Sequence, residues 1–304
     1  WRVTMGCEVK PYLYLKKMAT DVISYSDAVK TLENILCAMK KSSDCVGKHM
    51  TDAMKAEWWR ERELLDSELK HLLNRIECEW FQESKLFETS RHVNVMLYLD
   101  ALLHCIPWES LECNVSRAIV RGFKPNGNAD ACVDVEGDGN VVYVLNPSGD
   151  LVSTQKRFEK EFRRLESVKG WKGFVGDECR AHELWNCVEE SRVLLYCGHG
   201  SGEMWLPMKA LKKLKRIPEV VLLMGCSSGK LTLRGEFTPC GIPMEYLQQN
   251  GCKSVVANLW DVTDKDIDRL TTTLLNLWMN AEISQSGNCR GDALSVDEVG
   301  RDDS

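Results

Sequence analysis

A histidine and a cysteine, each set among glycines, are the residues of this sequence best suited to covalent chemistry. His199 lies within Gly-His-Gly-Ser-Gly (198–202), and Cys226 lies within Gly-Cys-Ser-Ser-Gly (225–229). A thiolate is a strong nucleophile, and a nearby imidazole can accept and return the proton that the reaction moves. We therefore expect Cys226 to attack a carbonyl carbon, while His199 promotes the ionised thiol and protonates the leaving amine.

The flanking glycines suit a site that stabilises negative charge. Gly200 has no side chain, so its backbone can approach a substrate closely and aim its N–H at a developing oxyanion. The N–H of Cys226 is the natural second donor. Gly200 and Cys226 are therefore the predicted oxyanion hole.

Each motif also has a simpler explanation. A histidine after a strand is often a hydrogen-bonded structural residue, and residues 225–229 could form a tight turn from strand to helix. A phosphate-binding loop is excluded, because the spacing between Gly225 and Gly229 is one residue short and Leu231 stands where Ser or Thr must bind magnesium. The two motifs together favour catalysis over these separate explanations.

The elements that must position these residues are strands alternating with helices. Apolar runs predict strands over 141–145, 193–197, 220–224 and 254–258, and helical patterns lie at 153–165, 178–190 and 243–250. A turn is predicted at 146–149. Such alternation predicts an α/β fold with a mostly parallel sheet covered by helices on both faces. Functional groups gather beyond the carboxyl ends of such strands, so His199 and Cys226 are expected at one edge.

A cluster of carboxylates follows the last predicted strand, and its members are Asp261, Asp264, Asp266 and Asp268. At a sheet edge they would favour a cationic group of a substrate. Aspartate in a first helical turn also stabilises the helix dipole, with Thr263 or Asp264 as the N-cap. The residues alone leave both explanations open.

Residues 1 to 105 are predicted to be helical and carry no motif for chemistry. A first helix has one apolar face and Ser26 or Asp27 as its N-cap; the face comprises Ala28, Leu32, Ile35, Leu36 and Met39. A loop is predicted over 41–48 and a charged helix over 51–83, with a heptad seam at Leu65, Leu69, Leu72 and Ile76. A third helix over 85–105 would pair with the second as an antiparallel hairpin joined near 82–84. This pattern is typical of a packing or docking module.

Composition limits the function classes. The net charge of −6 and pI near 5.7 argue against a general nucleic-acid binder. No apolar run approaches the roughly 18 residues of a membrane span, and no signal peptide opens the chain. The 14 cysteines form no C-x-x-C pair, so reduced thiols are expected rather than a zinc site. Because residue 1 is Trp1, we expect the chain to be part of a longer protein.

Several motifs resemble the protease region of separases, over about residues 105–280. They are Pro107-Trp108-Glu109-Ser110, Leu145-Asn146-Pro147, Trp171-x-Gly173 and the segments 196–202, 224–229 and 258–264. The resemblance implies a caspase-like fold. Its expected divisions are a helical substrate-binding or accessory region over 1–105, a protease domain over 106–283, and an acidic tail over 284–304 that is disordered or poorly packed.

What the resemblance implies for function is specific. Separases are cysteine endopeptidases that cleave after Arg, commonly in a Glu-x-x-Arg context, in the kleisin subunit of cohesin, and securin inhibits them as a pseudosubstrate. His199 and Cys226 match the catalytic dyad of the family. Asp264 and Asp261 become the favoured partners of the substrate arginine at P1, with Trp260 as a stacking surface. No cofactor, metal or membrane is expected, and the protein is expected in cytoplasm and nucleus, and on chromosomes or the spindle in mitosis.

Other caspase-like proteases and one protein of a different class remain as alternatives. A CHAT-type caspase relative shares the His and Cys elements but lacks the element at 107–110 and acts on other proteins; metacaspases differ around both residues. A catalytically silent interaction module would use the helices for docking and the sheet as a scaffold. The intact His199, Cys226 and flanking glycines favour an enzyme.

Overall fold

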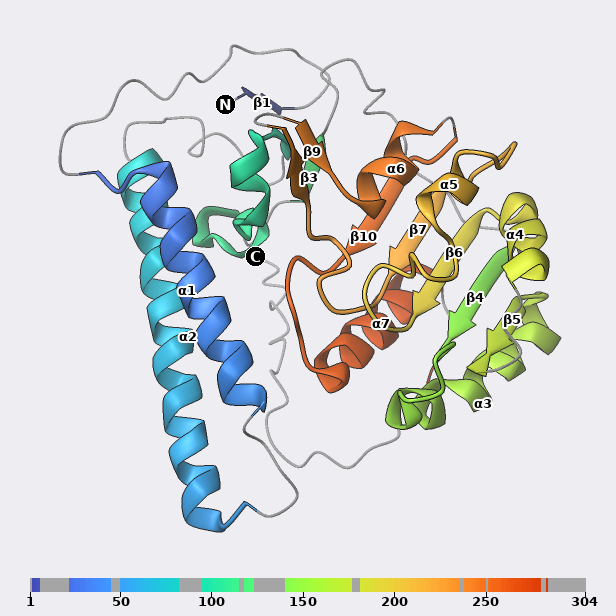
Figure 1. The fold of residues 1–304 in the computed structure, drawn as a ribbon, viewed down its shortest axis with the longest axis horizontal. Coiled ribbons are helices and arrows are strands. Elements are labelled where there is room, and N and C mark those ends of the chain that lie inside the picture. Colours follow the sequence, from blue (N-terminus) through green and yellow to red (C-terminus); the bar gives the residue numbers. More distant parts are fainter. Residues whose placement is uncertain are drawn as a thin grey trace, which may run out of the picture.

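The computed structural model consists of a helical part and a sheet covered by helices (Figure 1). It describes residues 2–5, 22–44, 50–81, 95–114, 118–122, 140–176, 181–235, 238–249, 251–279 and 283. The predicted tail over 284–304 lies outside these residues. Among the described helices, none is long and apolar enough to cross a membrane.

The larger part is built on a sheet of five parallel strands in the order β10-β7-β6-β4-β5. The strands are β4 (Val141–Leu145), β5 (Lys172–Val175), β6 (Val193–Cys197), β7 (Val220–Leu223) and β10 (Ser254–Ala257). Every residue of β4, β6 and β7 is buried, which explains their unbroken apolar sequence. The parallel sheet predicted from the sequence is confirmed.

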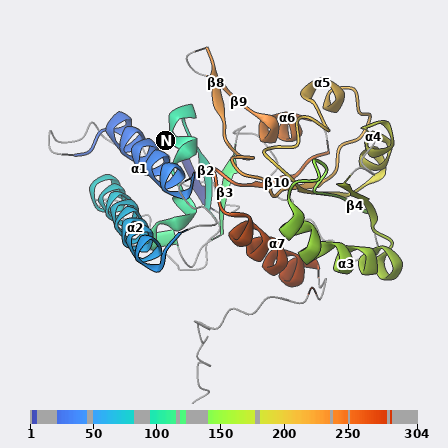
Figure 2. The same cartoon turned by 60° about the horizontal axis from the view of Figure 1, so that its bottom comes forward.

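Helices cover both faces of this sheet (Figure 2). The helices α3 (Val152–Lys169) and α7 (Asp264–Met279) lie on one face. The helices α4 (Ala181–Glu190), α5 (Met208–Leu211) and α6 (Ile242–Gln248) lie on the other. A short hairpin of β8 (Thr232–Arg234) and β9 (Thr238–Cys240) precedes α6.

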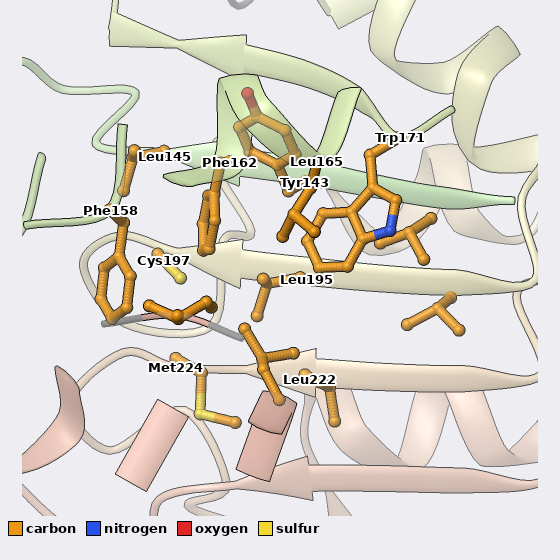
Figure 3. Packing of buried hydrophobic residues seen from close by; sticks show 14 of the residues in the cluster. Tyr143, Leu145, Phe158, Phe162, Leu165, Trp171, Leu195, Cys197, Leu222 and Met224 are labelled. Atoms are coloured by element: carbon orange, nitrogen blue, oxygen red, sulfur yellow. The ribbon is translucent and has the colours of Figure 1, made fainter. Parts of the chain in front are cut away.

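Alternate strand residues supply the two cores. In β4, Tyr143 and Leu145 face α3 and α7, whereas Val142 and Val144 face the opposite helices. Figure 3 shows the first core, in which the aromatic side chains of α3 pack over the strands beside Trp171. Because each strand is covered on both faces, its position and direction are fixed, and so is the edge where it ends.

The helical part is an antiparallel hairpin of α1 (Tyr25–Asp44) and α2 (Asp52–Phe81). The indole N–H of Trp58 donates to the Ser42 carbonyl at 2.9 Å, and that of Trp80 donates to the Ile23 carbonyl at 3.0 Å. These bonds join the end of each helix to the start of the other. The predicted apolar seam of α2 faces α1, with Leu72 and Ile76 at 2% and 0% exposure.

Three predictions for this part were wrong. The hairpin joins the first and second helices, not the second and a third. Within the predicted third helix, residues 95–98 form a strand and 101–105 a 3-10 helix, while 85–94 lie outside the described residues. The helix α1 continues to Asp44, through half of the loop predicted over 41–48.

The N-cap of α1 is Ser24, not Ser26 or Asp27. The Asp27 N–H donates to the Ser24 hydroxyl at 3.1 Å, and that hydroxyl donates to the Asp27 carboxylate at 2.6 Å. Ser24 is therefore the N-cap, because its hydroxyl accepts the N–H of the residue three positions further on, an N–H that has no partner within the helix. The cap thus lies two residues before Ser26 and three before Asp27, the caps that the sequence predicted.

A second, small sheet and several 3-10 helices complete the described residues of the helical part. The strand β2 (Val95–Tyr98) pairs antiparallel with β1 (Arg2–Met5) and parallel with β3 (Ile119–Gly122). The 3-10 helices are η2 (Ala101–Cys105), η3 (Trp108–Ser110) and η4 (Glu112–Asn114). Trp108 is buried in the same core as α1 and α2. The predicted division of the chain at residue 105 stays a prediction.

Acid is expected to weaken this core through His104 of η2. Burial, followed by the charge of Arg121, lowers the pKa of His104 to about 4. Between pH 6.5 and 4 the unfolded chain therefore binds a proton that the folded chain does not, so stability is lost as pH falls below 6.5. From pH 7.5 to 5.0 we expect His104 to remove about 2 kcal/mol of unfolding free energy.

Urea unfolding at these two pH values measures the effect. The variant His104→Gln should lose the corresponding part of the pH dependence, whereas His182→Gln, at an exposed position of α4, should keep it. Identical pH dependence in the His104 variant and the unaltered chain would contradict the prediction.

Candidate active site

The loops that carry His199 and Cys226 meet at the carboxyl edge of the large sheet. The strands β6 and β7 are neighbours, and beyond their paired residues the Met224 N–H donates to the Tyr196 carbonyl at 2.8 Å. A Cβ added at Gly225 would lie 2.5 Å from the Gly198 carbonyl oxygen and closer still to that of Gly200. The two backbones therefore touch at Gly225, and only glycine fits there.

The His199 loop is held from both sides. Nε2 of His199 lies 3.0 Å from Oδ2 of Asp150, which follows the turn after β4. The Tyr196 hydroxyl donates to the His199 carbonyl at 2.8 Å. The ring of Tyr196 fills the space beside Gly198 and Gly202. These two glycines therefore make room for an aromatic ring, a role that the sequence did not indicate.

The thiol of Cys226 is half-buried and donates to the Val262 carbonyl at 3.0 Å. Burial raises the pKa of Cys226 above the usual thiol value, and the charges of Asp261 and Asp264 raise it further. The hydrogen bond to Val262 and the charge of Lys40 act in the opposite direction. The thiol is thus protonated in this arrangement and needs a base to ionise.

The residue after the thiol has a left-handed backbone. Ser227 has a φ of 52°, which is uncommon for a residue with a side chain. Its N–H donates to the Trp260 carbonyl at 3.0 Å, and its hydroxyl donates to Oδ1 of Asp261. The segment after β10 therefore compensates for the strain next to Cys226.

Two further residues join the Cys226 loop to that segment. The side-chain amide of Asn258 donates to the Gly225 carbonyl at 3.1 Å, and its backbone carbonyl accepts the Gly229 N–H at 2.7 Å. The buried hydroxyl of Ser228 accepts the Asn258 N–H at 3.0 Å and donates to the Leu223 carbonyl. The Cys226 loop and residues 258–262 thus form one hydrogen-bonded unit.

The four carboxylates after β10 do not form one cluster. Asp261 binds Ser227 through Oδ1 and the ammonium of Lys40 through Oδ2, at 2.7 Å. These contacts, led by Lys40, lower the pKa of Asp261. Asp264 begins α7.

The other two carboxylates serve the structure of α7. The Thr263 hydroxyl donates to Asp266, whose N–H donates back to that hydroxyl, so Thr263 rather than Asp264 is the N-cap. Asp268 is 2% exposed and pairs with Arg157 and Thr154 of α3. Asp266 and Asp268 therefore serve the structure of α7, whereas Asp261 and Asp264 are the carboxylates whose charges act on the Cys226 thiol.

Sequence reasoning missed Asp150, Lys40 and the connecting roles of Ser228 and Asn258. Asp150 follows a strand of the same sheet, and the strand-end rule that singled out His199 would have found it. Lys40 is 221 positions from Asp261, and nothing in the pattern of either segment links them. Within the described ranges, no group of three or more His, Cys, Asp or Glu side chains could hold a metal ion.

The fold defines an α/β protein with a mostly parallel sheet flanked by helices, and the loops of His199 and Cys226 meet at the carboxyl edge of that sheet. The family model of the separin protease domain matches residues 82–267, more than half of the chain. The chain therefore belongs to the separin protease-domain family.

Relatives of known sequence agree with this assignment. The chain is 41% identical over 199 residues to the separin of Emericella nidulans, 40% over 198 residues to that of Schizosaccharomyces pombe and 35% over 205 residues to that of Mus musculus. These matches cover 61–64% of this chain but only 9–10% of each relative. The chain thus spans about a tenth of the length of these separins.

Solved structures show the same fold. Two crystal structures of the Saccharomyces cerevisiae separase–securin complex match with TM-scores of 0.67 and 0.70, each at 21% sequence identity. The matches cover 84% and 88% of this chain and 25% and 26% of the solved chain. The α/β fold expected from the sequence, with a mostly parallel sheet flanked by helices, is confirmed, and it matches the fold of these structures.

Proposed function

We propose that this chain is a cysteine endopeptidase in which Cys226 is the nucleophile and His199 the general acid and base. The contact of their two loops at Gly225 carries this proposal, because it joins the backbones that bear the thiol and the imidazole at the carboxyl edge of the sheet, where functional groups gather. Membership of the separin protease-domain family supports the reaction class.

The geometry suggests how the proton moves. Nε2 of His199 lies within hydrogen-bond distance of Asp150, so Nδ1 is the ring nitrogen proposed to accept the thiol proton. Nδ1 accepts the Sγ proton, the thiolate attacks the scissile carbonyl carbon, and the imidazolium then protonates the departing amine. Water hydrolyses the resulting thioester. In this cycle Cys226 gives up its hydrogen bond to Val262 as the substrate enters.

An oxyanion hole from Gly200 and Cys226 fits the same geometry. Gly200 has a φ of 58°, in the left-handed region that glycine adopts without cost. Its nitrogen lies 2.9 Å from the point where a Cβ on Gly225 would stand, one residue before Cys226. The Gly200 N–H thus lies beside the backbone of the Cys226 loop, and the two N–H groups are proposed to bind the oxygen of the attacked carbonyl, where the negative charge develops.

Arginine specificity is proposed for the acidic edge beside the thiol. Asp264 and Asp261 would receive the P1 guanidinium, with Trp260 as a stacking surface. The ion pair of Asp261 with Lys40 supports this assignment, because it shows that this carboxylate accepts a cation.

The substrate and partner are proposed from the family. We propose cleavage in a Glu-x-x-Arg context in the kleisin subunit of cohesin, inhibition by securin, and action in cytoplasm and nucleus. The securin-bound state of the solved relatives supports the inhibitor. The helical part over residues 1–105 is proposed to help bind the substrate.

A peptide panel tests the proposal. A kleisin-derived peptide with Glu-x-x-Arg should be cleaved after Arg, while the same peptide with Ala at P1 should be cut at least about 10²-fold more slowly, because an arginine pocket left unpaired loses its charged contacts. A peptide with Lys at P1 should fall between them. Chromatography with mass spectrometry reads the cut site. Equal cleavage after Ala would refute the arginine pocket, and no cleavage of any peptide would refute the function.

A further inference from the structure

A lysine from the helical hairpin occupies the acidic edge beside the thiol. Lys40 lies near the end of α1, and its ammonium is 2.7 Å from Oδ2 of Asp261. In Figure 1 the lower end of α1 lies opposite the left end of α7, where the loop that carries Asp261 leads into the helix. The contact connects the helical part of the chain with the edge that holds Cys226.

Both oxygens of Asp261 are in use in this arrangement. Oδ1 accepts the Ser227 hydroxyl, which is one residue from the thiol, and Oδ2 accepts Lys40. The Ser227 bond holds the loop that carries Cys226, at a residue whose backbone is left-handed, so giving it up would remove a support of that loop. Oδ2 is therefore the oxygen open to exchange, and a cationic substrate group must take it from Lys40.

The exchange is energetically easy. The Lys40 side chain is 63% exposed and that of Asp261 is 40% exposed, so water can solvate either group as the pair opens. Exposed ion pairs of this kind contribute at most about 1 kcal/mol. A guanidinium can bind a carboxylate through two N–H groups, whereas an ammonium acts as a point charge. An arginine side chain can therefore displace Lys40.

We propose that Lys40 is a built-in competitor for the cation site of Asp261 and thereby sets the affinity of this edge for the P1 side chain. The proposal rests on the function proposed above. It makes Lys40 a residue that tunes substrate affinity from outside the sheet, through the position of α1.

Competition makes a specific prediction about three peptides. Any cationic P1 group must displace Lys40, so Lys40→Met should tighten binding of Arg and Lys peptides by the same factor, about two- to fivefold. Their affinity ratio should stay constant, because the competitor penalises both equally. A peptide with Ala at P1 displaces nothing, so its affinity should not change.

Fluorescence anisotropy with labelled peptides measures these affinities. Using the full 304-residue chain with Cys226→Ser keeps the peptides uncut and separates binding from catalysis. The Lys40→Arg variant retains a competing cation, so it should bind the Arg peptide no more tightly than the chain with Lys40 does. Lys41→Met is the matched control, since it removes the same charge one residue away on α1, at an exposed position.

The outcomes are separable. Unchanged or weaker binding of the Arg peptide by Lys40→Met would overturn the proposal. If Lys41→Met tightened binding of the Arg peptide as much as Lys40→Met does, the effect would come from net charge. If Lys40→Met tightened binding of the Ala peptide equally, the effect would come from a general change in peptide access. Either result would also overturn the proposed competition. If the chain with Cys226 intact cleaves the Arg peptide, these failures leave the proposed function standing; absence of cleavage would refute that function itself.

Discussion

Replacing Cys226 with serine is expected to lower cleavage of the Glu-x-x-Arg peptide by at least about 10⁴-fold. A hydroxyl is far less acidic than a thiol, so His199 alone cannot generate enough alkoxide for attack. The fold should survive, because a serine hydroxyl can donate to the Val262 carbonyl as the thiol does. Single-turnover kinetics at excess enzyme, with thermal unfolding of the same preparation, measures both consequences.

A second cysteine provides the control. Cys240 of β9 is half-buried like Cys226 and also makes a side-chain hydrogen bond, with Thr232. Cys240→Ser should therefore repeat the chemical change without touching the sheet edge, and should retain cleavage. A Cys226→Ser variant that cleaves at the rate of the Cys240 variant would exclude Cys226 as the nucleophile.

Gly225→Ala is expected to lower turnover by about 10²-fold although it adds a single methyl group. The new Cβ would meet the backbone oxygens of Gly198 and Gly200, which cannot rotate away as a side chain could. The His199 and Cys226 loops must then separate, and a displacement on the order of 1 Å between reacting groups can cost about 10²-fold. The expected loss is in kcat, because the added methyl group separates the two loops whose side chains are proposed to react.

A control variant with a steric clash elsewhere in the sheet distinguishes this loss of kcat from a loss of stability. A Cβ at Gly173 of β5 would meet the ring of Tyr143, and β4 lies between β5 and the strand of His199. Gly173→Ala should lower the melting temperature but leave kcat per folded molecule unchanged. Melting curves and kcat for both variants decide the matter, and equal losses of kcat would mean that Gly225 acts only through stability.

The large sheet was predictable because burial on both faces leaves a strong trace in the sequence. The runs at 141–145 and 193–197 are entirely apolar, and the structure begins and ends both strands at the predicted residues. The edge strand β5 was missed because it is short, contains Gly173 and begins with an exposed lysine. The strand β2 was also missed, because its apolar residues have a spacing that suits a helix. It is a strand because it pairs with β1 and β3, which lie far from it in the sequence.

The site also has residues that could be predicted from the sequence and contacts that could not. Glycine-flanked His199 and Cys226 could be found because the topology of parallel strands makes both loops end at one edge. The contact of Lys40 with Asp261 depends on how the hairpin packs against the sheet, which local patterns do not encode. The burial of Asp268 could not be predicted either, because Asp264, Asp266 and Asp268 follow one another closely, as acidic residues do in a solvated first turn of a helix.

The hydrogen-bonded unit of the Cys226 loop and residues 258–262 has a consequence for how this protein could diversify. The backbone that presents Trp260 and Asp261 also carries the bonds that hold Ser227, Gly229 and the thiol. A substitution that reshapes this segment for another side chain would displace the nucleophile as well. Changes in substrate preference should therefore arise by altering partners such as Lys40 on α1, where the sequence can vary without disturbing the reacting atoms.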